Sequence, residues 1–183
     1  MKNEVLHIIS KRRSHRSYAD TQVTDEQLDK ILKAAMESPS AVNRQPWHFT
    51  VVQDADVLQR IHEAAKSVAI TRDDCSPRYK DDSFQIFYNA PTVIFISADD
   101  SRYSQIDSGI AVQNIALAAE SLGLGSVILG LPRDAFFSDQ KEELEKILNF
   151  PEGYSFKIAI SIGTPTDDKP AHQHKEGKIS FVK

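Results

Sequence analysis

The sequence predicts a single domain of the α+β class, and three observations lead to that prediction. A chain of 183 residues can bury roughly 70% of its unfolded surface in one core. Its helical and strand-like segments mix without strict strand–helix alternation, and two helices precede the first strand. No repeat, low-complexity tract or Pro/Gly-rich linker divides residues 1–183. We therefore expect one domain over the whole of 1–183.

The first half of the chain predicts three helices and one strand. Thr24 and Gln27 have the spacing of a capping box, and the apolar residues that follow recur at helical spacing until Ser38-Pro39. The predicted elements, in order, are a helix over 2–10, a helix from 24 to about 38, a strand over 47–52 and a helix over 55–66.

The second half predicts the centre of the sheet. The run TVIFIS, residues 92–97, is continuously apolar, as is typical of a strand buried on both faces. The segment 105–122 is a strong helix that is apolar on most sides, so we expect it to be buried nearly all round. The other predicted elements are a short helix around Phe84, Phe87 and Tyr88, strands over 126–129 and 154–162, a helix over 138–148 and a fifth strand over 179–182.

The last of these strands follows an extended polar arm that begins at Pro165. It has no obvious partner nearby in the chain, and an unpaired strand is a candidate for pairing with another subunit's sheet.

Composition excludes several classes of protein. A net charge of -4 and a pI near 5.9 argue against a general nucleic-acid binder. No apolar run reaches the length of a membrane span, and the N-terminus lacks the apolar core of a signal peptide, so we expect a cytoplasmic protein that meets no membrane. The single cysteine, Cys75, excludes a disulfide framework, and the spacing of His7, His48, His62 and His172 predicts no metal site.

A cluster of positive charge stands out against this acidic background. The stretch KRRSHRSY contains Lys11, Arg12, Arg13 and Arg16, with Ser14 as a hydroxyl donor. Alternate residues of an extended segment point the same way, so Arg12, Ser14 and Arg16 could converge on one phosphate. A solvated charge run and a targeting or nucleic-acid patch are the alternatives.

A second stretch, SPSAVNRQPWHF, joins small residues and side-chain amides to a proline-fixed turn before an aromatic strand. Small residues let a flat ligand approach the backbone, and amides offer donors and acceptors to the edge of a heteroaromatic ring. The alternative is an ordinary turn after a helix, with Trp47 in the core.

These two stretches together resemble the opening of the FMN-dependent nitroreductase family. SGIAVQNIALAAESLGLGSVILGLP is similar to that family's central helix and the strand behind it, and the ending SIGTPTDDKPAHQHKEGKISFV is similar to its closing segment. The resemblance covers essentially the whole chain. It implies an intertwined homodimer with a central mixed or antiparallel sheet flanked by helices, C-terminal strand exchange and FMN at the subunit interface.

The resemblance also implies the roles of particular residues. The phosphate, ribityl chain and pyrimidine edge of FMN would be held by Arg12, Arg13, Ser14 and Arg16. The same flavin would be approached from the other subunit by Pro39, Ser40, Ala41, Asn43 and Gln45. Backbone contacts near the reactive ring edge would come from Ile128, Leu129 and Gly130. The phosphate clamp would be completed by His174 and Lys175.

Three departures from the family pattern bear on the substrate. His174 and Lys175 stand where an arginine is more usual, so binding of the FMN phosphate by the tail would depend on the protonation of His174. The segment VILG, residues 127–130, carries no acidic residue, whereas some relatives have a glutamate beside the flavin. Only about ten residues separate TVIFIS from the central helix, where larger relatives insert a helical lid.

The activity implied is that of a cytoplasmic flavoprotein oxidoreductase. NADH or NADPH would donate hydride to flavin N5, and a small-molecule acceptor (a nitroaromatic, a quinone or a related electrophile) would then be reduced in a ping-pong scheme, with no catalytic side chain required. The alternatives are a flavin-binding protein with little turnover, or a dehalogenase or flavin-fragmenting enzyme on the same scaffold.

Overall fold

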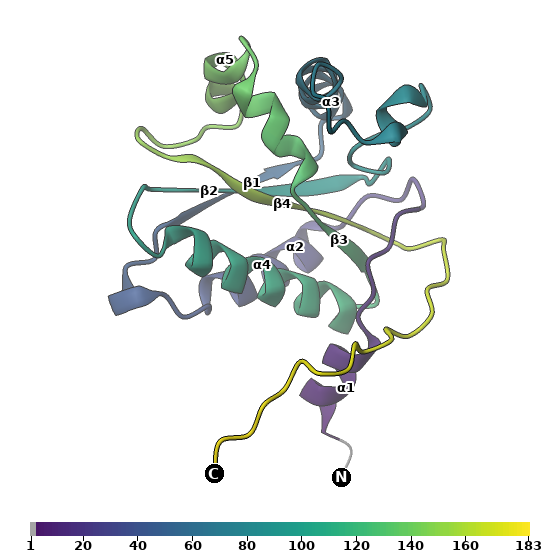
Figure 1. Ribbon diagram of the computed structural model, residues 1–183, viewed down its shortest axis with the longest axis vertical. Coiled ribbons are helices and arrows are strands. Elements are labelled where there is room, and N and C mark those ends of the chain that lie inside the picture. Colours follow the sequence, from purple (N-terminus) through teal and green to yellow (C-terminus); the bar gives the residue numbers. More distant parts are fainter. Residues whose placement is uncertain (1–2) are drawn as a thin grey trace.

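A computed structural model describes residues 3–183 of the chain. One four-stranded antiparallel sheet, in the order β1-β2-β4-β3, forms its centre. Helices α2 and α4 cover one face of the sheet, and α3 and α5 cover the other (Figure 1). The strands are β1 (Trp47–Val52), β2 (Thr92–Ala98), β3 (Gly125–Leu129) and β4 (Ser155–Gly163). The helices are α1 (Glu4–Lys11), α2 (Asp25–Met36), α3 (Ala55–Ala69), α4 (Ser104–Ser121) and α5 (Lys141–Ile147), with short 3-10 helices η1 (Ala41–Asn43), η2 (Pro77–Lys80) and η3 (Leu131–Phe137).

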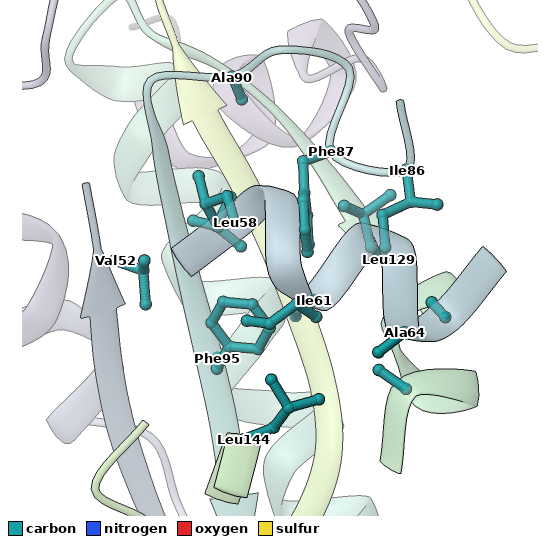
Figure 2. Packing of buried hydrophobic residues seen from close by; sticks show 14 of the residues in the cluster. Val52, Leu58, Ile61, Ala64, Ile86, Phe87, Ala90, Phe95, Leu129 and Leu144 are labelled. Atoms are coloured by element: carbon teal, nitrogen blue, oxygen red, sulfur yellow. The ribbon is translucent and has the colours of Figure 1, made fainter. Parts of the chain in front are cut away.

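Strand β2 explains why the sheet needs helices on both faces. All seven of its residues are buried. Because successive side chains of a strand point to opposite faces, Phe95 packs into the cluster beneath α3 while Ile94 packs into the cluster beneath α4. Figure 2 shows Phe95 on the first side, next to Ile61 of α3 and Leu144 of α5. The prediction of a strand buried on both faces is confirmed.

Local signals place several element boundaries where the sequence predicted them. Thr24 and Gln27 form the reciprocal capping box at the start of α2. Gly123 adopts a φ of 76° just after α4, the left-handed conformation that glycine tolerates at a helix end. The first helix spans Glu4–Lys11, and its predicted first residue, 2, lies outside the described part of the chain.

Two predicted features differ in the structure, and a third agrees with one of its two predicted forms. No helix forms around Phe84, Phe87 and Tyr88, because Tyr88 and Asn89 take positive φ angles of 56° and 53° that end any helical turn. The helix predicted over 138–148 begins only at Lys141, since η3 and an extended Ser138 precede it. The sheet, predicted as mixed or antiparallel, is antiparallel; its only parallel pairing among residues 3–183 is the isolated bridge from Ser14 to Ser126.

Helix α4 is also less buried in the single chain than its apolar sequence predicted. Its inner face is fully covered, but Ile106 is 62% exposed and Ile110 is 36% exposed. Val5 and Leu6 of the adjacent α1 are exposed as well. One chain therefore leaves an apolar surface on the α1 and α4 side.

The end of the chain runs over the surface in an extended path. Residues 179–182 form no strand within the described chain, and Ile179, Phe181 and Val182 are all exposed. A strand needs a neighbour for its backbone groups, so pairing with another subunit's sheet stays a prediction. Among residues 3–183, no helix has both the length and the apolar composition to cross a bilayer.

Candidate functional site

The basic segment (residues 11–18) lies along the outer edge of the sheet. The backbone N–H of His15 donates to Ser126 O of the edge strand β3 at 3.0 Å. On its other side the segment pairs with the start of the C-terminal tail (residues 164–183): Thr166 N–H donates to Ser17 O at 3.0 Å, and Tyr18 bridges to Pro165. The backbone of the segment from Ser14 to Tyr18 therefore lies between β3 and the tail.

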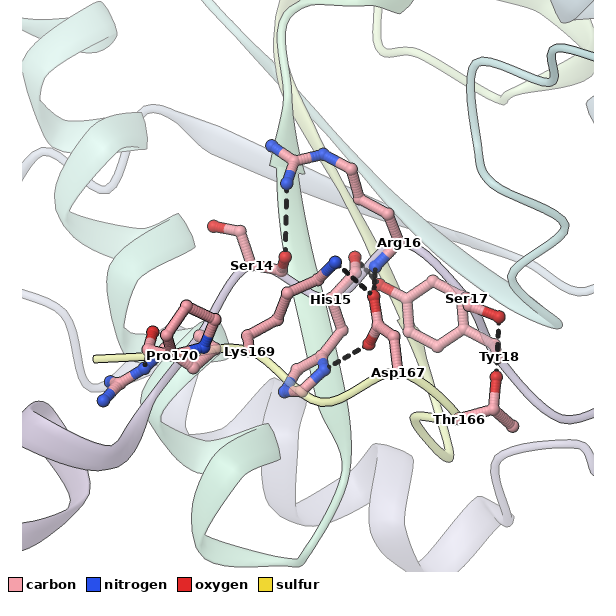
Figure 3. A network of polar contacts seen from close by, with 10 residues as sticks. Ser14, His15, Arg16, Ser17, Tyr18, Thr166, Asp167, Lys169 and Pro170 are labelled. Atoms are coloured by element: carbon pink, nitrogen blue, oxygen red, sulfur yellow. Dashed lines mark hydrogen bonds and ion pairs between the residues drawn. The ribbon is translucent and has the colours of Figure 1, made fainter. Parts of the chain in front are cut away.

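Asp167 of the tail joins these parts (Figure 3). One carboxylate oxygen lies 2.6 Å from His15 Nδ1, and the other accepts from Arg16 N–H at 2.9 Å. Lys169 Nζ lies 3.0 Å away. Partial burial opposes ionisation of Asp167, but these donors outweigh it and lower its pKa to about 2. We call this contact the clasp.

A glycine makes room for the clasp. A Cβ at Gly125 of β3 would lie 2.8 Å from Pro165 Cβ and 2.9 Å from His15 Cδ2. Real Cβ atoms do not approach other atoms so closely, so the tail and the histidine ring can sit against β3 only because residue 125 has no side chain.

The arginines of the basic segment differ in what they contact. Arg13 donates to Pro170 O at 2.9 Å and to the carbonyls at the end of α1, so it serves the fold. Arg16 lies over the Tyr88 ring at 5.7 Å, and in Figure 3 its guanidinium extends away from Asp167. Among residues 3–183, the side chain of Arg12 has one hydrogen-bond partner, His172 Nε2, at 3.5 Å. Within residues 3–183, no carboxylate forms an ion pair with Arg12 or Arg16.

The end of β3 offers open backbone, four residues beyond the contact of Ser126 with the basic segment. Ile128 and Leu129 pair with β4, and Gly130 follows at the surface as the chain turns into η3. A Cβ at Gly130 would meet nothing within 4 Å. The chain's own packing thus leaves space beside this backbone.

Residues 39–45, which we call the strained loop, form the second part of the candidate site. Val42, Asn43 and Gln45 have φ angles of 49°, 54° and 49°. Such angles are genuine outliers for a β-branched residue like Val42, whose side chain is 97% exposed. The buried carboxylate of Asp107, in the first turn of α4, accepts from Ala41 N–H at 3.3 Å.

The basic segment and the strained loop lie at opposite ends of α4 (Figure 1). Asp107 holds the loop at the start of this helix, whereas Lys11 pairs with Glu120 near its end at 3.3 Å. About 20 Å of helix separates the two anchors at 1.5 Å per residue. The two parts of the site are therefore far apart in one chain.

Sequence reasoning singled out the basic segment and the strained loop, but not the residues that position them. His15, Asp167 and Asp107 were not singled out, and their partners are too distant along the chain for any local pattern to reveal them. His174 and Lys175, predicted to reach the phosphate, lie in the exposed tail, in which His172 contacts Arg12. The predicted flavin contacts remain predictions.

Comparison with known proteins shows which family the chain belongs to. A model of the nitroreductase family matches residues 9–164. A protein of Archaeoglobus fulgidus, whose name joins NADH dehydrogenase and NAD(P)H nitroreductase, is 38% identical over 93% of this chain and 90% of its own. An iodotyrosine deiodinase of Thermotoga neapolitana is 27% identical over 95% of each chain. A crystal structure of a nitroreductase with bound FMN from Desulfitobacterium hafniense is 35% identical and superposes over the full length of both chains with a TM-score of 0.93.

Proposed function

Because the chain belongs to the nitroreductase family, we propose that it is an FMN-dependent NAD(P)H oxidoreductase that reduces nitroaromatics, quinones or related electrophiles. Its relatives carry FMN or are named for NAD(P)H chemistry. The finer parts of the proposal, namely the acceptor and the order of steps, depend on this chain's own residues.

The observation that carries the proposal is that two arginines of the basic segment have no carboxylate partner. Arg12 and Arg16 lie in an acidic chain with 26 Asp and Glu residues, yet neither forms an ion pair with a carboxylate of residues 3–183. Arginines that have no carboxylate partner keep their N–H donors for another anion. A phosphate, which guanidinium groups bind with paired N–H donors, fits this arrangement.

The chain's residues divide the work of holding such a cofactor. Arg12, Arg16 and the hydroxyl of Ser14 would bind the phosphate end, and the open backbone at Gly130 would receive the edge of the ring. When bound, FMN supplies the redox chemistry, taking hydride from NAD(P)H and delivering electrons to an acceptor. Positive charge near the cofactor would favour its anionic reduced form.

Two copies of the chain would complete the site. The strained loop cannot reach the basic segment within one chain, since each is held at its own end of α4. The exposed apolar surface of α1 and α4 supports pairing of two chains. We infer a homodimer in which the strained loop of one chain covers the flavin held by the other.

The proposal is tested by purifying the protein and two charge-reversal variants. The wild type should be yellow, with flavin absorbance near about 450 nm, and should oxidise NADH or NADPH with a quinone as acceptor. Arg12→Glu should reduce FMN affinity at least tenfold, because a charge-assisted contact becomes a repulsion. Lys146→Glu, at an exposed site on α5, is the matched control and should keep its flavin.

A colourless, monomeric protein that takes up no added FMN would end this proposal. So would a holoprotein whose flavin is reduced by neither NADH nor NADPH within seconds of anaerobic mixing, since that result indicates a flavin-binding protein with little turnover.

A second candidate function is reductive dehalogenation. The observation that favours it is the Thermotoga relative, which is named an iodotyrosine deiodinase and matches over nearly the whole chain. Assays with nitroaromatic, quinone and iodotyrosine acceptors under one reductant would separate the two candidates.

A further inference from the structure

Two hollows flank Gly130, at the end of β3. One, of about 260 Å³, lies between residues 72–79 and η3. The other, of about 450 Å³, lies between η3, α5 and the start of β4. Gly130 and Arg133 line both of them. Arg133 therefore stands beside the backbone where the reactive edge of the flavin is proposed to lie.

The larger hollow is basic and aromatic. Its only acidic lining residue is Glu145, which lies 3.9 Å from Lys141. Its cationic and aromatic lining residues are Arg133, Lys141, Lys157, Phe136, Phe137 and Phe156. Phe137 is 65% exposed although it is a large apolar side chain. A volume of this size falls within the range of sites for small molecules.

Two arginines near Gly130 differ in their partners. Arg72 donates to Asp74 at 2.8 Å and to Asp134 at 3.0 Å, and these carboxylates raise its pKa. Arg133 forms no ion pair with a carboxylate anywhere in residues 3–183; its guanidinium lies 5.3 Å from the centre of the Phe137 ring. The N–H donors of Arg72 are thus used by carboxylates of the chain, whereas those of Arg133 are available to a ligand.

Resting on the function proposed above, we propose that Arg133, with Lys141, binds the anionic group of an aromatic substrate in the larger hollow. The guanidinium would hold a phosphate or carboxylate, and Phe137 would stack on the ring system. Two substrates carry this chemistry: NADPH, through its adenosine 2′-phosphate, and an acidic nitroaromatic acceptor. The site would make the enzyme prefer anionic substrates over neutral ones of the same shape.

The experiment uses the double variant Arg133→Gln/Lys141→Gln as holoenzyme and has two arms. The first compares kcat/KM for NADPH with that for NADH, using a neutral quinone as acceptor. The second compares 4-nitrobenzoate with 4-nitrobenzyl alcohol, using one donor. The preference for the anionic member should fall about tenfold or more in the arm that holds the true substrate, because charge-assisted hydrogen bonds are lost. Lys146→Gln, on α5 outside the hollow, should leave both ratios unchanged.

A binding measurement accompanies the kinetics. Titration calorimetry with 2′,5′-ADP and with 4-nitrobenzoate should show at least a tenfold weaker Kd in the double variant for the ligand of the responding arm. Unchanged ratios in both arms would overturn the inference, as would loss of FMN from the double variant, which would make Arg133 a cofactor ligand. A wild type that oxidises neither nucleotide would overturn the proposed function, while the titrations would still test the anion site.

Discussion

The basic segment and the strained loop are both expected to touch one flavin, yet the chain positions them by different means. The basic segment lies in a polar network with a strand edge and the tail, and its local backbone is extended. The strained loop projects from the surface with three residues in the left-handed region. Its anchors to the rest of the chain are the buried carboxylate of Asp107, which accepts from Ala41 N–H, and the ion pair of Arg44 with Asp99 at 2.9 Å. The first region is stabilised by many contacts, whereas the second stores strain that its anchors must offset.

This difference indicates which chain would hold the cofactor phosphate and which would cover the flavin. A cofactor phosphate needs preorganised charge, which the clasp provides by fixing the backbone on which Arg16 sits. A covering loop needs shape more than charge, and its exposed Val42 suits contact with another surface. The comparison predicts that damage to the clasp harms folding and flavin binding together, whereas damage to the strained loop separates them.

The largest effect should follow from Gly125→Val. The added side chain would strike Pro165 and the His15 ring, which already approach within 2.9 Å of the Cβ position. Overpacking of this kind costs about 1–3 kcal/mol of folding free energy, and FMN should be lost because the basic segment moves off β3. Urea denaturation and flavin absorbance would measure the two effects.

Gly130→Ala is the matched control for stability, because its Cβ meets open space and its φ of -88° suits alanine. Its free energy of unfolding should stay within about 0.5 kcal/mol of wild type. If both substitutions lowered the free energy of unfolding equally, the close contact at residue 125 would not be the cause of the destabilisation.

A smaller effect should follow from Asp167→Asn, which removes the negative charge of the clasp. The pKa of Asp167 is lowered to about 2 from its ordinary 3.8. A lowered folded-state pKa stabilises the protein above the unfolded value, and that contribution is lost as the pH falls from about 4 toward 2. We expect a cost of about 1–2 kcal/mol at pH 7.

The stability difference between Asp167→Asn and wild type should therefore stay constant down to about pH 4 and shrink as the pH falls from about 4 toward 2, between the unfolded and folded pKa values of Asp167. The neighbouring, exposed Asp168→Asn should show no such difference at any pH. A constant gap across this range would mean that the clasp acts through shape and not through charge.

The fold was predictable where the signal is local, and the clasp was not. The capping box of Thr24 and Gln27 spans one helical turn, and the apolar composition of TVIFIS, residues 92–97, is enough to predict a buried strand. His15 and Asp167 are separated by most of the chain, so only the folded sheet brings them together. The backbone angles of Val42 and Tyr88 also escape sequence reasoning, because neither residue favours a positive φ by itself.

The smallest effect, and the one that separates the two regions most sharply, should come from Val42→Gly. Glycine adopts a φ of 49° without steric cost, so relief of strain should outweigh its greater unfolded-state entropy and stabilise the chain by up to about 1 kcal/mol. Thr21→Gly is the matched control: Thr21 is also an exposed β-branched residue outside helices and strands, but its φ is not positive, so glycine should cost about 0.5–1 kcal/mol. Both should be measured in urea at one protein concentration, since a dimer's stability depends on it. FMN affinity should nevertheless fall in Val42→Gly, because a looser loop must be ordered when the cofactor binds. Opposite changes in stability and flavin affinity would identify the loop's strain as preorganisation for the partner's flavin, and a loss of stability equal to that of Thr21→Gly would show that the loop is not strained.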